Sequence, residues 1–343
     1  MSSGNRPITI AVDAMGGDHA PREVIKGAVE AARKDPEIRI MLIGPSTAIK
    51  EELLKINAVE LDIPCIHTDE FIKEGEPPAL ALRQKRNATI LIATKLVQKG
   101  EADAVVSAGP TGAVVASAMM ILGMAEGMER PAVGGPILGF SPKTVVMDFG
   151  GNVDCKSFQL LSFAVVGCVY SQRLLGISNP TVALLSVGSE EGKGNELIKE
   201  CFPLFKRSGL NFVGNVEGND IVTGKADVII CDGFVGNILL KFLEGLGGAM
   251  SQWLKSSLAG KLTDDEIAKL RYDLLSKTVG ADLVGAAPLL GVNGVAMVMH
   301  GRSHAAEFRN ALVQTKNVIK SGLVNVVNTE LKAMADKMKL DKN

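Results

Sequence analysis

The chain has 343 residues, of which 46% are hydrophobic and 22% charged, and its net charge at pH 7 is −1. This composition excludes a disordered protein, because the chain has enough apolar residues to bury a sizeable core. It also argues against a nucleic-acid-binding protein, which usually carries a basic excess. The length accommodates either two lobes or one large α/β domain.

Short β-rich runs alternate with amphipathic helical patterns. The run ITIAVDA at 8–14 predicts a buried strand, and the apolar spacing of 21–35 predicts a helix after it. The alternation continues with a strand at 38–44, a helix at 48–56, and strands at 102–109, 143–150, 181–188, 210–216 and 226–233. It predicts an α/β protein with a mostly parallel sheet, whose polar, Gly-rich strand ends face a common cleft.

The N-terminal residues lack the features of a signal peptide, and the longest uncharged stretches are interrupted by Pro and Gly. We therefore expect a soluble protein that lies at most on a membrane surface. The five cysteines are scattered and form no C-x-x-C pair. This arrangement predicts reduced thiols and no metal site.

Residues 236–277 differ from the rest and predict helix, turn and helix. Thr263 and Glu266 form a capping box at the start of the second helix. An apolar group near the junction is flanked by lysines and consists of Trp253, Leu254, Leu258 and Leu262. An exposed apolar tip of this kind suits a membrane surface, and a hairpin packed on a partner subunit fits the pattern equally well.

Two Gly-rich loops follow predicted strands. SVGSEEGKGN at 186–195 is not a P-loop, because its glycines are one residue too close and Gly194 follows Lys193 where Ser or Thr is required. It still offers backbone amides and a cation, which suit a phosphate. SAGPTGA at 107–113 precedes an apolar helix, whose N-terminus favours an anion; a tight turn with a helix cap is the alternative.

Fingerprints of other enzyme classes are absent from the sequence. No G-x-G-x-x-G dinucleotide motif and no G-x-S-x-G nucleophile elbow occurs. The nucleophile is therefore more readily a bound substrate than a side chain, and we expect no cofactor.

The opening VDAMGGDHAP at 12–21 closely resembles the N-terminal signature of the PlsX family of phosphate acyltransferases. Further blocks resemble the family in family order and together span most of the chain: SAGPTGA, GGNVDCK (150–156), SVGSEEGKGNEL (186–197), CDGFVGNILLK (231–241) and APLLGVNGVAMVMHG (287–301). The resemblance implies one domain over 1–343, a three-layer αβα sandwich like that of isocitrate dehydrogenases and phosphotransacetylases. The hairpin at 236–277 would protrude from it.

The resemblance also implies the reaction and its partners. The enzyme would be a homodimer that transfers a long-chain fatty acyl group from acyl carrier protein to inorganic phosphate. The acyl phosphate would then pass to a membrane glycerol-3-phosphate acyltransferase for phospholipid synthesis. The family associates peripherally with the membrane, so the resemblance implies a cytoplasmic protein that contacts the inner face of the cell membrane through the apolar tip at 253–262.

The expected phosphate site combines a cation with backbone amides. From residue chemistry and the family blocks, we expect Lys193 and Gly194 to bind the anion together with the loop residues Gly109, Thr111 and Gly112. Phosphate is already a usable nucleophile at neutral pH, so the protein must mainly hold it close to the thioester carbonyl.

The other expected site residues act on the thioester or on protons. Asn237 and Asn152 would donate to the oxyanion or position the thioester. Asp232 would orient Lys193 or accept a proton, and His19 is a second candidate for proton transfer.

Arg83, Lys85 and Arg86 are candidates for docking the acidic carrier protein. The chain departs from the family pattern at Pro110, where the family has Asn, and at Gly151, where it has Ala. Pro110 removes one amide N–H and one side-chain amide from the loop, which permits an altered phosphate affinity.

Two functions from other classes remain open. One is a phosphotransacetylase-like enzyme that uses coenzyme A and short acyl groups. The other is a non-catalytic membrane scaffold that recruits lipid enzymes through the apolar tip. Turnover of coenzyme A thioesters against carrier thioesters discriminates the first, and liposome binding without turnover would mark the second.

Overall fold

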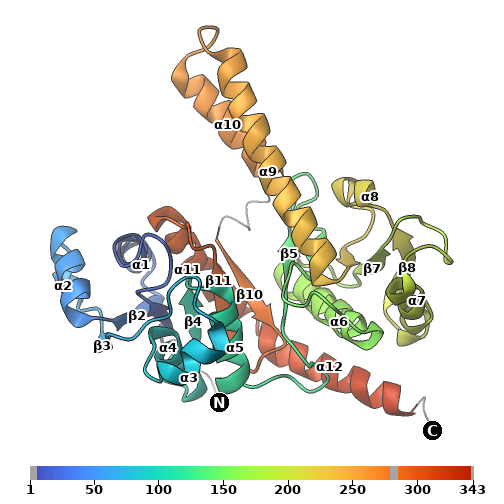
Figure 1. Cartoon of the computed structure of the whole chain (residues 1–343), viewed down its shortest axis with the longest axis horizontal. Helices are drawn as coiled ribbons and strands as arrows, with labels where there is room; N and C mark the ends of the chain where they lie inside the picture. Colours follow the sequence, from blue (N-terminus) through green and yellow to red (C-terminus); the bar gives the residue numbers. More distant parts are fainter. Residues whose placement is uncertain (1–5, 279–284, 341–343) are drawn as a thin grey trace. The chain divides into compact units, whose positions relative to one another are not determined.

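The computed structural model describes residues 6–278 and 285–340, with side chains up to 337. Contacts within the chain separate two compact units (Figure 1). Unit 1 comprises Met1–Ala125 and Gly285–Asn328, and unit 2 comprises Glu126–Val284 and Thr329–Asn343. The single domain over 1–343 stays a prediction.

The strands of unit 1 form a mostly parallel sheet. They are β1 (Ile8–Asp13), β2 (Ile38–Gly44), β3 (Cys65–His67), β4 (Ala104–Ser107), β10 (Ala286–Leu290) and β11 (Val295–Met299). Their order is β3-β2-β1-β4-β11-β10, and only the β10–β11 pair is antiparallel among these neighbours. The chain runs outward from β1 to β3 and returns to β4 on the other side of β1. The β1/β4 boundary is therefore a topological switch point, where α/β proteins bind ligands.

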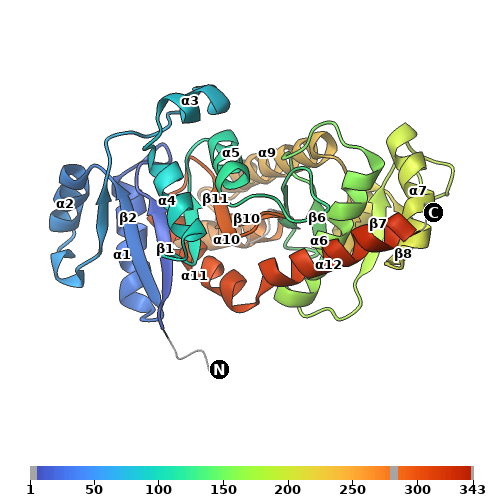
Figure 2. The ribbon, with the colours of Figure 1, turned by 90° about the horizontal axis from the view of Figure 1, so that it is seen from below.

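Helices cover the unit 1 sheet. They are α1 (Arg22–Lys34), α2 (Ser46–Lys55), α3 (Pro78–Gln84), α4 (Thr89–Gln98), α5 (Thr111–Ile121) and α11 (Ala305–Lys320), with a short 3-10 helix at Val59–Leu61. Helix α1 packs against α11, and α4 packs against α5. Right-handed crossovers put α1 and α4 on opposite faces, because the chain leaves β1 in one direction and returns in the other (Figure 2).

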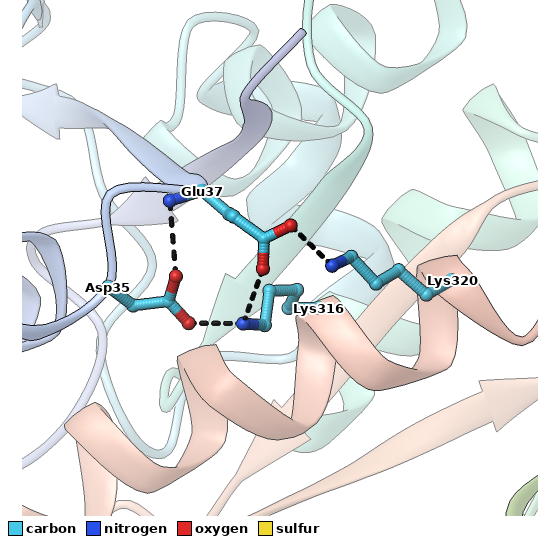
Figure 3. Close-up of polar contacts among 4 residues, drawn as sticks. All are labelled: Asp35, Glu37, Lys316 and Lys320. Atoms are coloured by element: carbon cyan, nitrogen blue, oxygen red, sulfur yellow. Dashed lines mark hydrogen bonds and ion pairs between the residues drawn. The ribbon is translucent and has the colours of Figure 1, made fainter. Parts of the chain in front are cut away.

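Polar contacts join α1 and α11 along their length. The N–H of Ala305 donates to Glu23 Oε2 over 3.0 Å, and Arg309 pairs with Glu30 at 3.3 Å. At the far end, Asp35 and Glu37 face two lysines of α11 (Figure 3).

This far end is an ion cluster of four residues (Figure 3). Lys316 pairs with Asp35 and, at 3.1 Å, with Glu37, while Lys320 pairs with Glu37 at 2.5 Å. The hydrogen bond from Lys316 lowers the pKa of Asp35, and Asp35 in turn raises the pKa of Lys316. The cluster fixes the C-terminal half of α11 to the segment that enters β2.

Unit 2 also has mostly parallel strands. Its strands are β5 (Ala132–Pro136), β6 (Val145–Met147), β7 (Thr181–Leu185), β8 (Asn211–Val216) and β9 (Val228–Ile230), in the order β5-β6-β9-β7-β8. The described pairs are parallel except β5–β6. Its helices include α6 (Ser157–Leu174), α7 (Glu196–Ser208), α8 (Gly218–Thr223) and part of α12 (Leu323–Leu340). Because β6, β9 and β7 are parallel neighbours, their carboxyl ends meet at one edge.

The helix–turn–helix expected at 236–277 is present in unit 2 as α9 (Gly233–Leu258) and α10 (Asp264–Thr278), which lie side by side (Figure 1). The capping box is confirmed: Thr263 N–H donates to Glu266 Oε2 over 2.9 Å. Arg271 Nε donates to Ser251 Oγ over 2.9 Å and ties the two helices together. No helix in the described part of the chain is long and apolar enough to cross a membrane.

Candidate active site

The carboxyl ends of β1 and β4 are joined by buried side chains. Ser107 Oγ donates to Asp13 Oδ2 over 2.7 Å and accepts the N–H of Gly109 over 3.0 Å. Asp13 is fully buried, and this burial raises the pKa of its carboxyl group although Ser107 and the N–H of Met15 donate to it. The switch point of unit 1 therefore holds a desolvated carboxyl group that the sequence analysis did not identify.

The loop after β1 lies directly on this group. A methyl group at Gly16 would lie 2.6 Å from the Gly109 nitrogen and 2.8 Å from Ser107 Oγ. Glycine is therefore required at position 16 by close backbone approach. This contact joins two glycine-containing blocks that lie far apart in the sequence.

The structure separates the predicted phosphate-binding residues of the 107–113 loop into two kinds. The N–H of Gly109 donates to Ser107, so it is engaged within the protein. Thr111 and Gly112 are exposed and begin α5, where the first N–H groups of a helix have no partner within it. Pro110 takes the N-cap position without a side-chain cap. Anion binding at Thr111 and Gly112 stays a prediction.

His19 lies at the same sheet edge of unit 1 and has an aromatic partner. Its ring stacks on His304, with centroids 4.3 Å apart and planes at 16°. His304 Nδ1 lies 3.8 Å from Glu23 Oε2. The sequence could not show this pair, because His19 and His304 lie near opposite ends of the chain. The proton-transfer role of His19 stays a prediction.

In unit 2, the DFGGN segment after β6 is organised by Asp148. This buried carboxyl group accepts Asn152 Nδ2 over 2.8 Å and the N–H of Val133 over 3.1 Å. Burial raises the pKa of Asp148 in spite of these donors. Asn152 Nδ2 also donates to the carbonyl of Pro131 over 2.9 Å. The side-chain donor of Asn152 is thus engaged inside the protein, which favours a positioning role over direct donation to an oxyanion.

The start of α9 packs on this segment and brings Asn237 beside it. A methyl group at Gly236 would lie 1.8 Å from the carbonyl oxygen of Asp148, so helix and loop are in backbone contact. A methyl group at Gly150 would lie 3.3 Å from Asn237 Cβ. Asn237 is therefore adjacent to the DFGGN segment, which contains Asn152, the second candidate for contacting the oxyanion or the thioester.

Asp232 is the N-cap of α9, since its Oδ1 accepts the N–H of Val235 over 2.8 Å. No hydrogen bond or ion pair joins it to Lys193 in the residues that the structure describes. The contact gives Asp232 a structural role, and its orienting and proton-accepting roles stay predictions.

Cys155 lies near Asn152 but is not an activated nucleophile. Its Sγ donates to the carbonyl of Asn152 over 3.2 Å, and burial raises its thiol pKa to about 11. A nucleophilic cysteine needs a lowered pKa, because the thiolate is the reactive form.

Lys193 is carried by the loop after β7, the strand beside β9. Its side chain is exposed, and its ammonium group has no ion pair within residues 6–278 and 285–337. Its N–H donates to the carbonyl of Glu190 over 3.0 Å, which closes a turn before Gly194. Lys193 thus follows β7, while Asp232, the N-cap of α9, and Asn237, in its first turns, follow β9, the neighbour of β7.

The three candidates for carrier docking are not equivalent. Lys85 pairs with Glu76 at 2.6 Å and donates to the carbonyl of Phe71 over 2.9 Å, so it holds its own loop together. Arg83 and Arg86 are exposed, and neither has an ion pair in the described residues. The pair of arginines remains available to a partner.

The expected apolar tip is part of a longer surface. Trp253 is 66% and Leu262 38% exposed, while Leu254 and Leu258 are half-buried. Exposed apolar side chains recur along α9 at intervals of three or four residues: Phe234, Ile238, Phe242, Leu246, Met250 and Trp253. We define these six residues as the α9 stripe. The sequence analysis identified only its far end.

Comparisons with known proteins extend over nearly the whole chain. A family model described as "Fatty acid synthesis protein" matches residues 8–326. The chain is 42% identical over 329 residues to a phosphate acyltransferase of Pelotomaculum thermopropionicum, with 95% of each chain covered. It is 43% identical over 327 residues to a phosphate acyltransferase of Desulforamulus reducens, with 94% of this chain and 97% of that one covered.

Solved structures share the fold. The EutD phosphotransacetylase from Staphylococcus aureus matches with a TM-score of 0.62 and 17% identity, over 92% of this chain and 94% of that one. A phosphotransacetylase from Streptococcus pyogenes matches with a TM-score of 0.61 and 17% identity, over 97% and 100%. At this identity the likeness shows the fold alone, and the phosphotransacetylase-like α/β fold predicted from the sequence is confirmed.

Proposed function

The chain belongs to the fatty acid synthesis protein family, as its resemblance to the PlsX phosphate acyltransferases predicted, and on this premise we propose that it transfers a fatty acyl group to inorganic phosphate. The observation that carries the proposal is the 42% identity to a phosphate acyltransferase over 95% of both chains. The acyl donor is acyl carrier protein, and the acyl phosphate formed enters phospholipid synthesis.

The reaction is a substitution at the thioester carbonyl carbon. A phosphate oxygen attacks this carbon, and the carbonyl oxygen carries the negative charge of the tetrahedral intermediate. The carbon–sulfur bond then breaks, and the carrier leaves as a thiolate that takes up a proton. The products are acyl phosphate and free carrier thiol. Because phosphate is the nucleophile, catalysis requires that the anion be held in place and that the oxyanion be stabilised.

Lys193 binds the phosphate in this proposal. Its exposed ammonium group has no competing carboxylate partner in the described residues, so its charge is available to an anion. Gly194 directly follows this turn and supplies a backbone N–H in the proposal. The amides of Thr111 and Gly112 at the start of α5 are the unit 1 candidates for anion binding.

Asn237 is the proposed donor to the oxyanion. It lies beside Gly150, where Asp148 and Asn152 fix the DFGGN segment by hydrogen bonds. It also lies near the N-terminus of α9, where the helix dipole favours a developing negative charge. A fixed donor of this kind stabilises the intermediate without reorganisation.

The α9 stripe supports two further proposals. Its length along α9 favours a second copy of the chain as the partner, giving a homodimer. Its far end, with Trp253 and the exposed residues Lys255 and Lys261, favours contact with an anionic membrane surface. Peripheral attachment would release the acyl phosphate close to the membrane acyltransferase that consumes it.

The function is tested by mixing the purified protein with palmitoyl-acyl carrier protein, with and without inorganic phosphate, and following release of the carrier thiol. Phosphate-dependent release, with acyl phosphate trapped as the hydroxamate by hydroxylamine, supports the proposal. Release from acetyl-coenzyme A but not from the carrier thioester would instead make the protein a phosphotransacetylase. The absence of release from either thioester would overturn both enzymatic functions.

A further inference from the structure

Strand β8 contains a bulge opposite β7. Val182 pairs with Phe212, but Leu184 pairs with Asn215, so β8 has one residue more than β7 between these positions. Gly214 has a φ of +98°, a conformation that suits glycine. Without the extra residue, one-to-one pairing from Val182 and Phe212 onward would put Gly214 opposite Leu184. The bulge places the side chain of Asn215 there instead.

The side chain of Asn215 reaches the turn that carries Lys193. Its Nδ2 donates to the carbonyl of Glu190 over 3.0 Å and lies 3.5 Å from the carbonyl of Lys193. These carbonyls belong to the first and last residues of the turn closed by the bond from Lys193 N–H to Glu190. One buried amide therefore contacts both ends of the turn.

Asn215 is buried, and its side-chain amide is engaged on one side. It is 4% exposed, and its Oδ1 has no hydrogen-bond partner in the residues that the structure describes. Ser186 Oγ is also buried without a partner there, and a methyl group at Gly194 would lie 3.0 Å from it. The hydrogen bonds of the Asn215 side chain among the described residues are therefore those that Nδ2 makes with the 190–193 turn.

We propose that Asn215 is a positioning residue for Lys193: from the β8 bulge, it holds the 190–193 turn so that the ammonium group meets the phosphate. The inference rests on the proposed function, in which Lys193 binds inorganic phosphate. Asn215 acts through the backbone of the turn and touches no substrate. Its loss releases the turn, so the affinity for phosphate falls while the thioester site is unchanged.

The test compares five proteins: wild type, Lys193→Ala, Asn215→Ala, the double variant, and Asn211→Ala as the matched control. Asn211 lies in the same strand and also donates from its side chain to a backbone carbonyl, that of Asn179, over 3.3 Å. For each protein the KM for inorganic phosphate, the KM for palmitoyl-acyl carrier protein, kcat and Tm are measured. Asn215→Leu, which fills the same space with an apolar side chain, replaces Asn215→Ala if that variant does not fold.

Asn215→Ala is expected to raise the phosphate KM about tenfold, the equivalent of one lost hydrogen bond, with the thioester KM unchanged. The double variant is expected to be no worse than Lys193→Ala, because residues that act through one another are not additive. Asn211→Ala should match the wild type. A loss in Tm with both KM values unchanged is the signature of a merely structural role and overturns the inference.

The remaining outcomes separate this inference from the proposed function. If Lys193→Ala raises the phosphate KM but Asn215→Ala does not, only the positioning role of Asn215 falls. If Lys193→Ala leaves the phosphate KM unchanged, the phosphate-binding role of Lys193 and the inference built on it both fall. Additive effects of Lys193→Ala and Asn215→Ala would show that Asn215 acts independently, which also overturns the inference.

Discussion

Ser107 Oγ lies 2.7 Å from Asp13 Oδ2 and donates to it, so the ends of the two strands at the unit 1 switch point are joined by one hydrogen bond. Removing the hydroxyl leaves a buried carboxyl group with one donor fewer and the N–H of Gly109 without its acceptor. Ser107→Ala is therefore expected to lower the free energy of unfolding by about 1–3 kcal/mol. Urea denaturation measures it, and an unchanged midpoint would contradict it.

The raised pKa of Asp13 gives a second prediction. Because its folded pKa lies above the unfolded value, the folded state binds more protons. Stability should therefore fall as the pH rises from the unfolded pKa, about 3.9 for Asp, through the folded pKa, and stay constant above it. Asp13→Asn should remove this part of the pH dependence. Urea denaturation at a series of pH values checks it, and the same pH dependence of the free energy of unfolding for both proteins would contradict the prediction.

Lys316 is expected to stabilise unit 1 through its bonds to Asp35 and Glu37. Lys316→Met should lower the free energy of unfolding at neutral pH by about 1–2 kcal/mol, while Lys34→Met, at an exposed position of α1, should have little effect. The raised pKa of Lys316 means that its contribution is complete below the unfolded pKa and lost as the pH rises through the folded pKa. The lowered pKa of Asp35 means that its contribution is lost as the pH falls through the folded pKa.

Gly236→Ala should disrupt the contact of α9 with the DFGGN segment. The added methyl group would lie 1.8 Å from the carbonyl oxygen of Asp148, so the helix must shift away. We expect kcat to fall, because Asn237 moves with the helix. Gly248→Ala is the matched control, since no atom lies within 4 Å of a methyl group there. Equal activity of the two variants would show that the contact does not matter for turnover.

The arginines of the α3 region are expected to dock the acidic carrier. The charge reversal Arg83→Glu/Arg86→Glu should raise the KM for the carrier thioester about tenfold, with the phosphate KM unchanged. The effect should weaken at high salt, as exposed charges are screened. Lys85→Gln serves as the contrast, because Lys85 is held by Glu76 and should change stability instead. An unchanged carrier KM for the double reversal would remove both arginines as docking residues.

Much of the fold follows from local sequence patterns. The strands at 8–14 and 38–44 and the hairpin helices were predicted within a few residues, because alternation and helical spacing are properties of neighbouring residues. The capping box of Thr263 and Glu266 was predicted for the same reason. The N-cap role of Asp232 could also be predicted locally, since Asp before a helix is a frequent N-cap. From the sequence, Asp232 is instead expected to orient Lys193 or accept a proton.

The site is less accessible to sequence reasoning, because its contacts join distant segments. The partnership of Asp13 with Ser107 depends on the pairing of β1 with β4. The contact of Asn215 with the Lys193 turn depends on a bulge, which is a property of register between two strands. Neither the strand order nor the register is encoded in a local pattern, so these residues were missed.

Helices α1 and α11 are tied at three levels: at Glu23, at Glu30 and at the Asp35–Lys316 cluster. Local opening of α11 must break all three contacts, and it would also remove the helix face against which α1 packs. The two helices should therefore open as one foldon, although almost the whole chain separates them. Their slowest backbone amides would then share a single free energy of hydrogen exchange. During synthesis of the protein, α1 would complete its packing only after the C-terminal part of the chain has been made.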